Sequence, residues 1–236
     1  MGDTSASSFA EIARLLEAEP DIEATVVQII DLARQTIASD HAGVTLLHGR
    51  NQVETAAATS PIVEKCDALQ YEFGEGPCVQ AIWNHDTFLV DDMRNDCRWP
   101  RWGPQAADLG LRSILSIRLF TFGETHGALN LYSSEPRHFD DEDVAVAHIF
   151  AAHASVALAA ARQEEHLRKA IDARHVIGQA QGILMERFDI DAPRAFTVLR
   201  RYSQHRNVKL RAVAEELIAN RILPGQRRDE PGLSLL

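Results

Sequence analysis

The sequence predicts an α+β fold with an antiparallel sheet over residues 21–162, followed by a bundle of three helices over residues 163–222. Two observations predict this arrangement. In the first region, pairs of short alternating runs joined by turn residues lie between helical patterns, which is typical of strands joined as hairpins. In the second region, every apolar pattern has the helical period.

The sequence marks where the two helices before the first strand begin and end. A short helix is predicted from Phe9 to Glu19 and is closed by Pro20, so residues 1–20 form a lead segment. Asp21, a residue type suited to an N-cap, precedes a longer helical pattern that ends near Ile37.

The strand patterns follow in pairs. Residues 42–47 and 53–58 are extended runs joined by a turn with Gly and Asn, and residues 113–120 and 126–132 alternate most clearly. The elements expected between these pairs are, in order, a helix from Ser60-Pro61 to about Tyr71, a helix at 78–84, a strand at 87–90, and a loop with a short helix at 91–110.

A long helix is expected after Asp140, because the acidic residues at 141–143 suit a helix amino terminus, and it can continue without a break into the bundle. One of its faces consists largely of small residues, which let another helix approach closely. Two interpretations of this face remain open: contact with a second copy of the chain, or packing on the chain's own sheet. The face consists of Val144, Ala147, Ala151, Ser155 and Leu158.

Three amphipathic patterns define the bundle. Asp191 and Pro193 mark the start of its second helix, and Asn207 is expected to cap its third. Three short helices bury only a small core, so the bundle is expected to lean on a neighbour or on a second copy, as in a homodimer through helices. The residues expected to face inward are Ile177, Ala180, Ile183, Leu184, Met185, Phe188, Ala195, Phe196, Leu199, Tyr202, Leu210, Val213, Ala214, Leu217 and Ile218.

The charge of the chain changes sign between the two regions. Residues 1–166 carry 11 Lys and Arg against 26 Asp and Glu, a net charge of 11 − 26 = −15. Residues 167–222 carry 11 against 6, a net charge of 11 − 6 = +5. Because nucleic-acid phosphates attract Lys and Arg mainly through counterion release, this local basic module indicates a nucleic-acid partner.

The bundle also carries a specific set of residues. They are the run Ile177-Gly-Gln-Ala-Gln-Gly-Ile-Leu-Met-Glu-Arg187, then Ala195-Phe196, Leu199-Arg200, Ser203, Asn207, Lys209-Leu210 and Val213-Ala214. Together they resemble the ANTAR domain of bacterial antitermination regulators. The resemblance implies a module that binds paired RNA hairpins in nascent transcripts and so prevents a terminator hairpin from forming. The family usually has Lys where this chain has Gln181, so one positive charge is missing from the expected RNA face.

Seven residues of the bundle are predicted to bind RNA. Arg and Lys side chains would hold phosphates or stack on bases, and amide side chains would read base edges. A glycine in mid-helix costs about 1 kcal/mol relative to Ala, so at Gly182 either the helices pack tightly or another backbone or a nucleotide comes close. The predicted residues are Arg174, Gln181, Gly182, Arg200, Ser203, Asn207 and Lys209.

The α+β region has its own recognisable segments. They are Gly74-Glu-Gly-Pro-Cys-Val-Gln-Ala-Ile82, Leu111-Arg-Ser-Ile-Leu-Ser-Ile117 and Gly127-Ala-Leu-Asn-Leu-Tyr132. They resemble a GAF domain, a resemblance that implies a sensory or dimerising domain with a candidate small-ligand pocket between its sheet and the helices over it. The predicted organisation is therefore a lead at 1–20, a GAF-like domain at 21–162, an ANTAR-like domain at 163–222 and a flexible tail at 223–236.

No catalytic or metal-binding set has useful spacing. His148 and His153 are five residues apart, which does not place them on one helix face as metal ligands. The Gly-Glu-Gly-Pro segment is followed by no Lys-Ser or Lys-Thr, as a phosphate-binding loop requires. Asp91, Asp92 and Asp96 fit a solvated loop better than a cation site. The sequence therefore predicts no enzyme, no metal and no cofactor.

Cys78 allows two interpretations. It follows Gly76-Pro77 at a helix start, where backbone N–H groups and the helix dipole would lower the pKa of its thiol and make it a sensor-pocket or redox residue. A buried Cys78 would instead be a small inert apolar residue.

The sequence also predicts a compartment. Three cysteines with no C-x-x-C pair fit reduced thiols. No apolar run is expected to reach the roughly 18 to 20 residues that span a bilayer, and residues 1–8 lack the pattern of a signal peptide. A cytoplasmic protein without a membrane partner is expected.

Two other function classes fit parts of the sequence. A phosphotransfer signalling protein such as a histidine kinase would use His175, but no acidic residue follows it directly and no ATP-binding pattern is present in these residues. A DNA-binding transcription activator could use the second and third helices as a helix-turn-helix, but the turn at 205–208 lacks the usual glycine. Binding to hairpin RNA in competition with duplex DNA separates the three classes.

Overall fold

The computed structural model describes residues 6–19, 21–49, 52–84 and 86–221. The chain forms two compact units, Met1–Glu165 and His166–Leu236, and one helix, α6 (Asp141–Phe188), contributes to both. The predicted tail at 223–236 lies outside the described residues.

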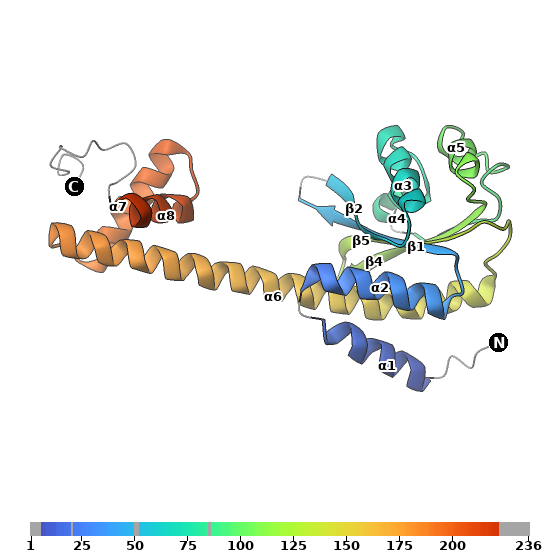
Figure 1. Cartoon of the computed structure of the whole chain (residues 1–236), viewed down its shortest axis with the longest axis horizontal. Helices are drawn as coiled ribbons and strands as arrows, with labels where there is room; N and C mark the ends of the chain where they lie inside the picture. The colour runs from blue at the N-terminus through green and yellow to red at the C-terminus, as the bar shows by residue number, and fades with distance from the viewer. Residues whose placement is uncertain (1–5, 20, 50–51, 85, 222–236) are drawn as a thin grey trace. The chain divides into compact units, whose positions relative to one another are not determined.

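The first unit is built on a five-stranded antiparallel sheet with the strand order β2-β1-β5-β4-β3 (Figure 1). The two hairpins that the alternation predicted, β1–β2 and β4–β5, are joined because β5 also pairs with β1. The α+β class with an antiparallel sheet is confirmed. The strands are β1 (His41–His48), β2 (Gln52–Ala58), β3 (Phe88–Val90), β4 (Ser113–Thr121) and β5 (Glu124–Ser133).

Helices cover both faces of this sheet (Figure 1). One face packs against α2 and the first part of α6, and Leu115, Ile117 and Leu119 of β4 lie in that core. Ile114, which points the other way, packs in a second core beneath α3 and α5. The helices of this unit besides α6 are α1 (Ala6–Glu17), α2 (Ile22–Thr36), α3 (Pro61–Phe73), α4 (Pro77–Asn84) and α5 (Trp102–Asp108).

The small-residue face of α6 packs on the unit's own sheet. Ala147, Ala151 and Leu158 are buried in the core that contains β4 and β5, and the backbone N–H of Phe120 donates to Ser155 Oγ at 2.9 Å. Of the two interpretations of this face, packing on the chain's own sheet is therefore the correct one.

By length and composition, α6 is the one helix among the described residues that could cross a membrane. The expectation that no apolar run is long enough was therefore wrong. The core helix of a folded domain meets the same criteria, because it too is apolar over several turns, and the inner face of α6 is buried in such a core.

The Gly-Glu-Gly-Pro segment, residues 74–77, joins α3 to α4 and also contacts the start of α5. Gly74 ends α3 in the left-handed region at φ 65°, which a glycine adopts without strain. Glu75 Oε1 then accepts hydrogen bonds from the backbone N–H groups of Arg101 and Trp102 at 2.7 and 2.9 Å. The carboxylate thus satisfies donors at the start of α5, which has no side-chain cap of its own.

Two further glycines of the recognised segments are required for space. A Cβ on Gly76 would lie 2.2 Å from Gln70 Oε1, the atom that accepts a hydrogen bond from the Cys78 N–H at 2.9 Å. A Cβ on Gly127 would lie 1.9 Å from the carbonyl oxygen of Thr45 on the neighbouring strand. Close backbone approach explains why these segments contain glycine.

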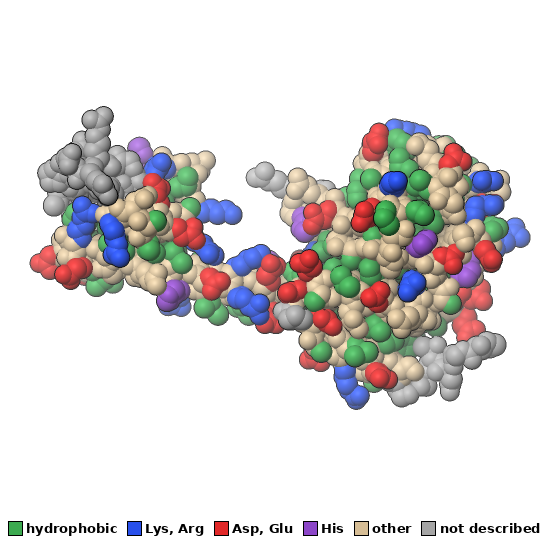
Figure 2. All heavy atoms as spheres, in the orientation of Figure 1, with side chains coloured by type: hydrophobic (Ala, Val, Ile, Leu, Met, Phe, Trp, Pro, Cys, Tyr) green, Lys and Arg blue, Asp and Glu red, His purple; other side chains and the backbone are tan. Residues whose placement is uncertain are grey.

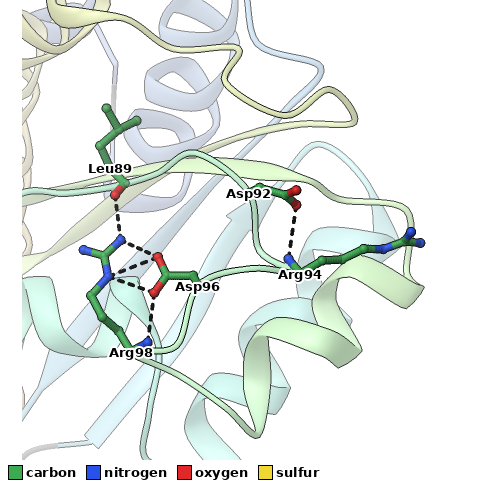
Figure 3. Close-up of polar contacts among 5 residues, drawn as sticks. All are labelled: Leu89, Asp92, Arg94, Asp96 and Arg98. Carbon is green, nitrogen blue, oxygen red and sulfur yellow. Dashed lines mark hydrogen bonds and ion pairs between the residues drawn. The ribbon is translucent and has the colours of Figure 1, made fainter.

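The loop between β3 and α5 is held by arginine side chains. Arg98 donates to the carbonyl oxygen of Leu89 at 2.8 Å and, through Nε, to both oxygens of Asp96 at 3.0 Å (Figure 3). Arg112 forms a bidentate pair with Asp92 at 3.0 and 2.8 Å. Among the described residues, no three His, Cys, Asp or Glu side chains are grouped to hold a metal.

Replacing Arg98 with Ala is expected to lower the free energy of unfolding by about 1 kcal/mol, because its charge-assisted hydrogen bonds are partly exposed and screened. Arg94 is the matched control. Its backbone N–H donates to Asp92 at 3.2 Å, while its side chain extends away from these residues (Figure 3). Urea unfolding of both variants measures the difference, and equal losses for Arg98→Ala and Arg94→Ala would refute the role of the Arg98 guanidinium.

The second unit consists of the end of α6, α7 (Ala192–Arg206) and α8 (Leu210–Asn220). α7 starts as predicted, because Asp191 Oδ1 accepts a hydrogen bond from the Arg194 N–H at 2.9 Å and Pro193 lies in the first turn. The three helices are confirmed. Their shared core consists of Ala180, Leu184, Ala195, Leu199, Val213, Ala214 and Leu217.

The predictions for three residues of this unit, Asn207, Phe196 and Met185, were wrong. Asn207 does not cap α8; it ends α7 in the left-handed region at φ 53°, which Asn tolerates, and Lys209 precedes α8. Phe196 and Met185, which were expected to face inward, are 38% and 37% exposed. A core of three short helices is small, so the apolar stripes are wider than the surface that they can bury.

Candidate nucleic-acid interface and buried polar cluster

Lys and Arg side chains lie on the surface of the second unit (Figure 2), and its most basic element is α7. Its 15 residues contain no Asp or Glu and include four arginines. Arg206 pairs with Glu216 of α8 at 3.3 Å, whereas Arg200 is exposed and has no ion-pair partner among the described residues. The charge of Arg200 is therefore available to a polyanion.

Three of the predicted RNA-binding residues lie along one ridge of α7. Arg200, Ser203 and Asn207 are spaced by three and four residues, and Phe196 lies one turn before Arg200. A partly exposed aromatic ring beside a guanidinium can stack on an unpaired base while the cation contacts phosphate. Sequence reasoning missed Phe196 because an apolar residue in an amphipathic pattern is assigned to the core.

Ser203 also holds the turn that follows this ridge. Its hydroxyl donates to the carbonyl oxygen of Val208 at 2.7 Å, and the Val208 N–H donates to the carbonyl oxygen of Ser203 at 3.1 Å. Lys209 is the next residue and is exposed. The paired contacts of Ser203 therefore fix where Lys209 lies relative to the ridge.

The other three predicted residues lie on α6. The side-chain amide of Gln181 donates to the carbonyl oxygen of Ala192 at 3.0 Å and so joins α6 to the start of α7. Arg174 is exposed. No hydrogen bond or ion pair between described residues joins Arg174, Gln181 or Gly182 to the ridge on α7, so the seven predicted residues fall into two groups.

Gly182 is not explained by packing within the unit. A Cβ built on Gly182 would meet nothing within 4 Å, and the same holds for Gly178 one turn earlier. Tight packing among the described helices of this unit therefore does not account for the glycine. The second interpretation, close approach of another backbone or a nucleotide, stays a prediction.

A cluster of buried polar side chains lies between the sheet and α3, where a ligand pocket was expected. Asp67 of α3 accepts hydrogen bonds from the Tyr132 hydroxyl and, at 3.0 Å, from the Thr55 hydroxyl. The Tyr71 hydroxyl lies 2.8 Å from Thr45 Oγ1 and 2.9 Å from Thr55 Oγ1. Polar groups that bond to one another therefore occupy the place where the sequence predicted a pocket.

Asp67 is a buried carboxyl group in this cluster. Burial raises its pKa to about 6, although hydrogen bonds from Tyr132, Thr55 and Gln70 act in the opposite direction. The carboxylate makes no ion pair with a Lys or Arg of the described residues. Its ionised form therefore depends on hydrogen bonds alone.

Cys78 belongs to the same cluster and is buried, with Sγ 3.1 Å from Thr45 Oγ1. Burial raises the pKa of its thiol to about 12, and the negative charge of Asp67 acts in the same direction. The hypothesis of a reactive thiolate at a helix start is therefore contradicted. Removal from water outweighs the helix dipole here, and Cys78 is a core residue.

The chain thus joins an α+β domain with an antiparallel sheet to a domain of three helices. Residues 19–159 match the GAF domain model and residues 165–218 match the ANTAR domain model. The chain belongs to the GAF domain family, and its second unit is an ANTAR domain. GAF domains serve as sensor domains, and ANTAR domains bind RNA in antitermination regulation. No curated protein matches the chain.

Several solved structures share the fold of the first unit. The GAF domain of a phosphoenolpyruvate-protein phosphotransferase from Acinetobacter is 13% identical with a TM-score of 0.56, covering 70% of this chain and 99% of that one. The corresponding domain from Coxiella burnetii is 17% identical with a TM-score of 0.55, covering 68% and 95%. Free methionine-R-sulfoxide reductase from Neisseria meningitidis is 20% identical with a TM-score of 0.54, covering 66% and 89%. At these identities the similarity establishes the fold alone.

Proposed function

We propose that this protein is a cytoplasmic transcription antitermination regulator whose ANTAR domain binds paired hairpins in nascent RNA under the control of its GAF domain. One observation carries the proposal. The unit that matches an RNA-binding family exposes a helix, α7, with four arginines and no acidic residue. The phosphotransfer and DNA-binding alternatives are not favoured by the family match.

The chemistry of the ridge fits a hairpin loop. Arg200 and Lys209 would contact phosphates, Phe196 would stack on an unpaired base, and Asn207 would read a base edge. A single copy presents one such ridge. Two hairpins in one transcript therefore call for two copies, so we propose that the protein acts as a homodimer through its helices.

The buried polar cluster is the proposed sensor site. A polar small molecule that entered between the sheet and α3 would exchange hydrogen bonds with Asp67, Tyr71 and Thr45, which now bond among themselves or with Thr55 and Tyr132. α6 belongs to both units, so a change in its packing in the first unit is the proposed route to the second. The ligand would then shift an equilibrium between RNA-binding and masked forms.

Equilibrium binding of the full-length protein to an RNA with two adjacent hairpins tests this function. We expect binding to weaken as salt rises, because each neutralised phosphate of single-stranded RNA adds about 0.7 to the log–log slope. Excess duplex DNA should displace little of the RNA. Displacement by duplex DNA or heparin as effective as by the hairpin RNA itself would exclude the proposed function.

A further inference from the structure

A hollow of about 580 Å³ lies in the first unit where the end of α2, the starts of β1 and α3, the turn after α5 and the end of β5 meet. Its volume falls in the range of small-molecule sites, about 300–1,000 Å³. It shares no lining residue with the buried polar cluster around Asp67, so it is a separate place in the fold. We call it the Arg34–Asp40 hollow. The lining residues that matter here are Arg34, Ser39, Asp40, Ile62, Leu109 and Leu111.

Two side chains of opposite charge line this hollow and do not pair with each other. The guanidinium of Arg34 is exposed and forms no ion pair with the described part of the chain. Asp40 accepts hydrogen bonds from the Ser134 N–H at 2.8 Å and from the hydroxyls of Ser134 and Ser133 at 2.7 and 3.1 Å. These bonds, that of the Ser134 N–H first, lower the pKa of Asp40 below its ordinary value, so the group is ionised at neutral pH.

Asp40 keeps one oxygen for another donor. All three of its hydrogen bonds end on Oδ2, and Oδ1 accepts none from the described residues. A carboxylate has room for about four hydrogen bonds over its two oxygens. The hollow therefore offers an available anion and an available cation.

The hollow also has an apolar wall that the core holds in place. Leu111 is 2% exposed and belongs to the core beneath α3 and α5, and Ile62 and Leu109 are partly buried against the same core. The turn after α5 is fixed by backbone hydrogen bonds, since the N–H groups of Leu109 and Leu111 donate to the carbonyl oxygen of Ala106 at 3.2 and 3.3 Å. This wall can cover an apolar group without rearranging, as in a preformed ligand site.

Ser39 adds a buried polar group without a partner. It is 7% exposed and lines the hollow, and its hydroxyl makes no hydrogen bond within the described residues. Buried polar side chains in folded proteins are nearly always hydrogen-bonded, so an orphaned hydroxyl calls for an explanation. A polar molecule bound beside Ser39 supplies one.

A simple ion fits this set of residues poorly. A bare anion would pair with Arg34 and bring a second negative charge near Asp40. A metal ion would find one carboxylate, and no group of three His, Cys, Asp or Glu side chains that could hold one occurs among the described residues. Neither ion would use the apolar wall. A ligand that carries both charges and an apolar group matches all three features.

We infer that the Arg34–Asp40 hollow binds a small zwitterion, an α-amino acid with an apolar side chain. Its carboxylate pairs with the Arg34 guanidinium, and its ammonium group donates to Asp40 Oδ1. Its side chain lies on the wall formed by Ile62, Leu109 and Leu111. This site is additional to the proposed sensor site around Asp67, and it does not depend on RNA binding by the second unit.

Isothermal titration calorimetry of the full-length protein with L-leucine, L-isoleucine, L-valine and L-methionine tests the ligand class. We expect at least one of the four to bind. For leucine, three analogues each remove one feature: isocaproate lacks the ammonium group, isoamylamine lacks the carboxylate, and glycine lacks the apolar side chain. Each is expected to bind about 10-fold more weakly or worse, because a charged hydrogen bond or an apolar contact is lost. No binding by any of the four amino acids, or binding of isocaproate as tight as that of leucine, overturns the inference.

Substitutions in the hollow supply the second test. Arg34→Gln removes a guanidinium that has no ion pair in the described chain, so it should leave urea unfolding unchanged while weakening amino-acid binding about 10-fold or more. Asp40→Asn should weaken binding as much, and its urea unfolding shows whether the contacts with Ser134 persist. The matched controls Arg14→Gln and Asp31→Asn change exposed residues that do not line the hollow, and each should alter binding by less than about twofold.

The variants also separate this site from the proposed sensor site. Binding that survives Arg34→Gln, or that the control variants weaken equally, overturns the inference. Loss of binding in Asp67→Asn together with retention in Arg34→Gln would place the amino acid in the buried polar cluster and would overturn it as well. Hairpin binding is measured separately and is not decided by any of these results.

Discussion

Replacing Arg200 and Lys209 together with Ala is expected to weaken binding to hairpin RNA by about 100-fold, because each phosphate or base contact contributes roughly 1–3 kcal/mol. Both residues are exposed, and neither has an ion-pair partner among the described residues. Loss of two phosphate contacts should also reduce the salt slope by about 1.4. Fluorescence titration at several salt concentrations measures both quantities.

The matched control replaces arginines that already have partners. Arg206 pairs with Glu216 at 3.3 Å, and Arg211 pairs with Glu215 at 2.7 Å. Because these guanidinium groups are engaged within the unit, Arg206→Ala and Arg211→Ala should each change affinity by less than about threefold. If the control variants lose as much affinity as the double variant, binding depends on overall charge and the ridge is not the site.

The contribution of Asp67 to the free energy of unfolding is expected to fall by up to about 3 kcal/mol as pH rises from about 4 to about 7. The pKa of Asp67 is about 6 in the folded protein against 3.8 for an ordinary aspartate. The folded state therefore holds the proton more tightly, so the contribution is complete below pH 3.8 and is lost as pH rises through 6. Urea unfolding across this range measures it.

Asp67→Asn should remove this part of the pH dependence, because the amide does not titrate. Asp92→Asn is the opposite control. Hydrogen bonds from Arg112 hold the pKa of Asp92 below its usual value, so Asp92 stabilises the fold at neutral pH and loses this effect as pH falls. Parallel stability curves for the wild type and Asp67→Asn would show that the buried carboxyl does not govern the slope.

Local signals in the sequence predicted most of the fold. Asp21, Ser60 and Asp191 each accept a backbone hydrogen bond at the start of the helix that they were expected to begin. These signals work because a cap and its helix lie within a few residues of each other. The prediction for Asn207 was wrong because its local signal is ambiguous. Asn suits both the start of a helix and the left-handed end of the preceding helix.

Contacts between distant residues could not be predicted in this way. Asp67 and Tyr132 are hydrogen-bonded across 65 residues, and nothing near Asp67 in the sequence marks it as buried. The small-residue face of α6 likewise could not be assigned from spacing. The structure assigns it, because Ala147 and Leu158 are buried in the core that contains β4 and β5.

The candidate site was predicted in part. The family motif pointed to Arg200, Ser203, Asn207 and Lys209, which the structure places on one ridge and at the turn after it. The exposure of Phe196 could not be predicted from the motif, because it depends on how little apolar surface a core of three short helices can bury.

Ultraviolet crosslinking in cells, followed by sequencing of the bound RNA, tests most directly whether the ANTAR domain binds paired hairpins in nascent transcripts. We expect the wild type to recover fragments with two adjacent hairpins upstream of terminators, and the variant with Arg200→Ala and Lys209→Ala to lose them. Fragments without hairpins, or equal recovery by the variant, would contradict RNA recognition by the α7 ridge.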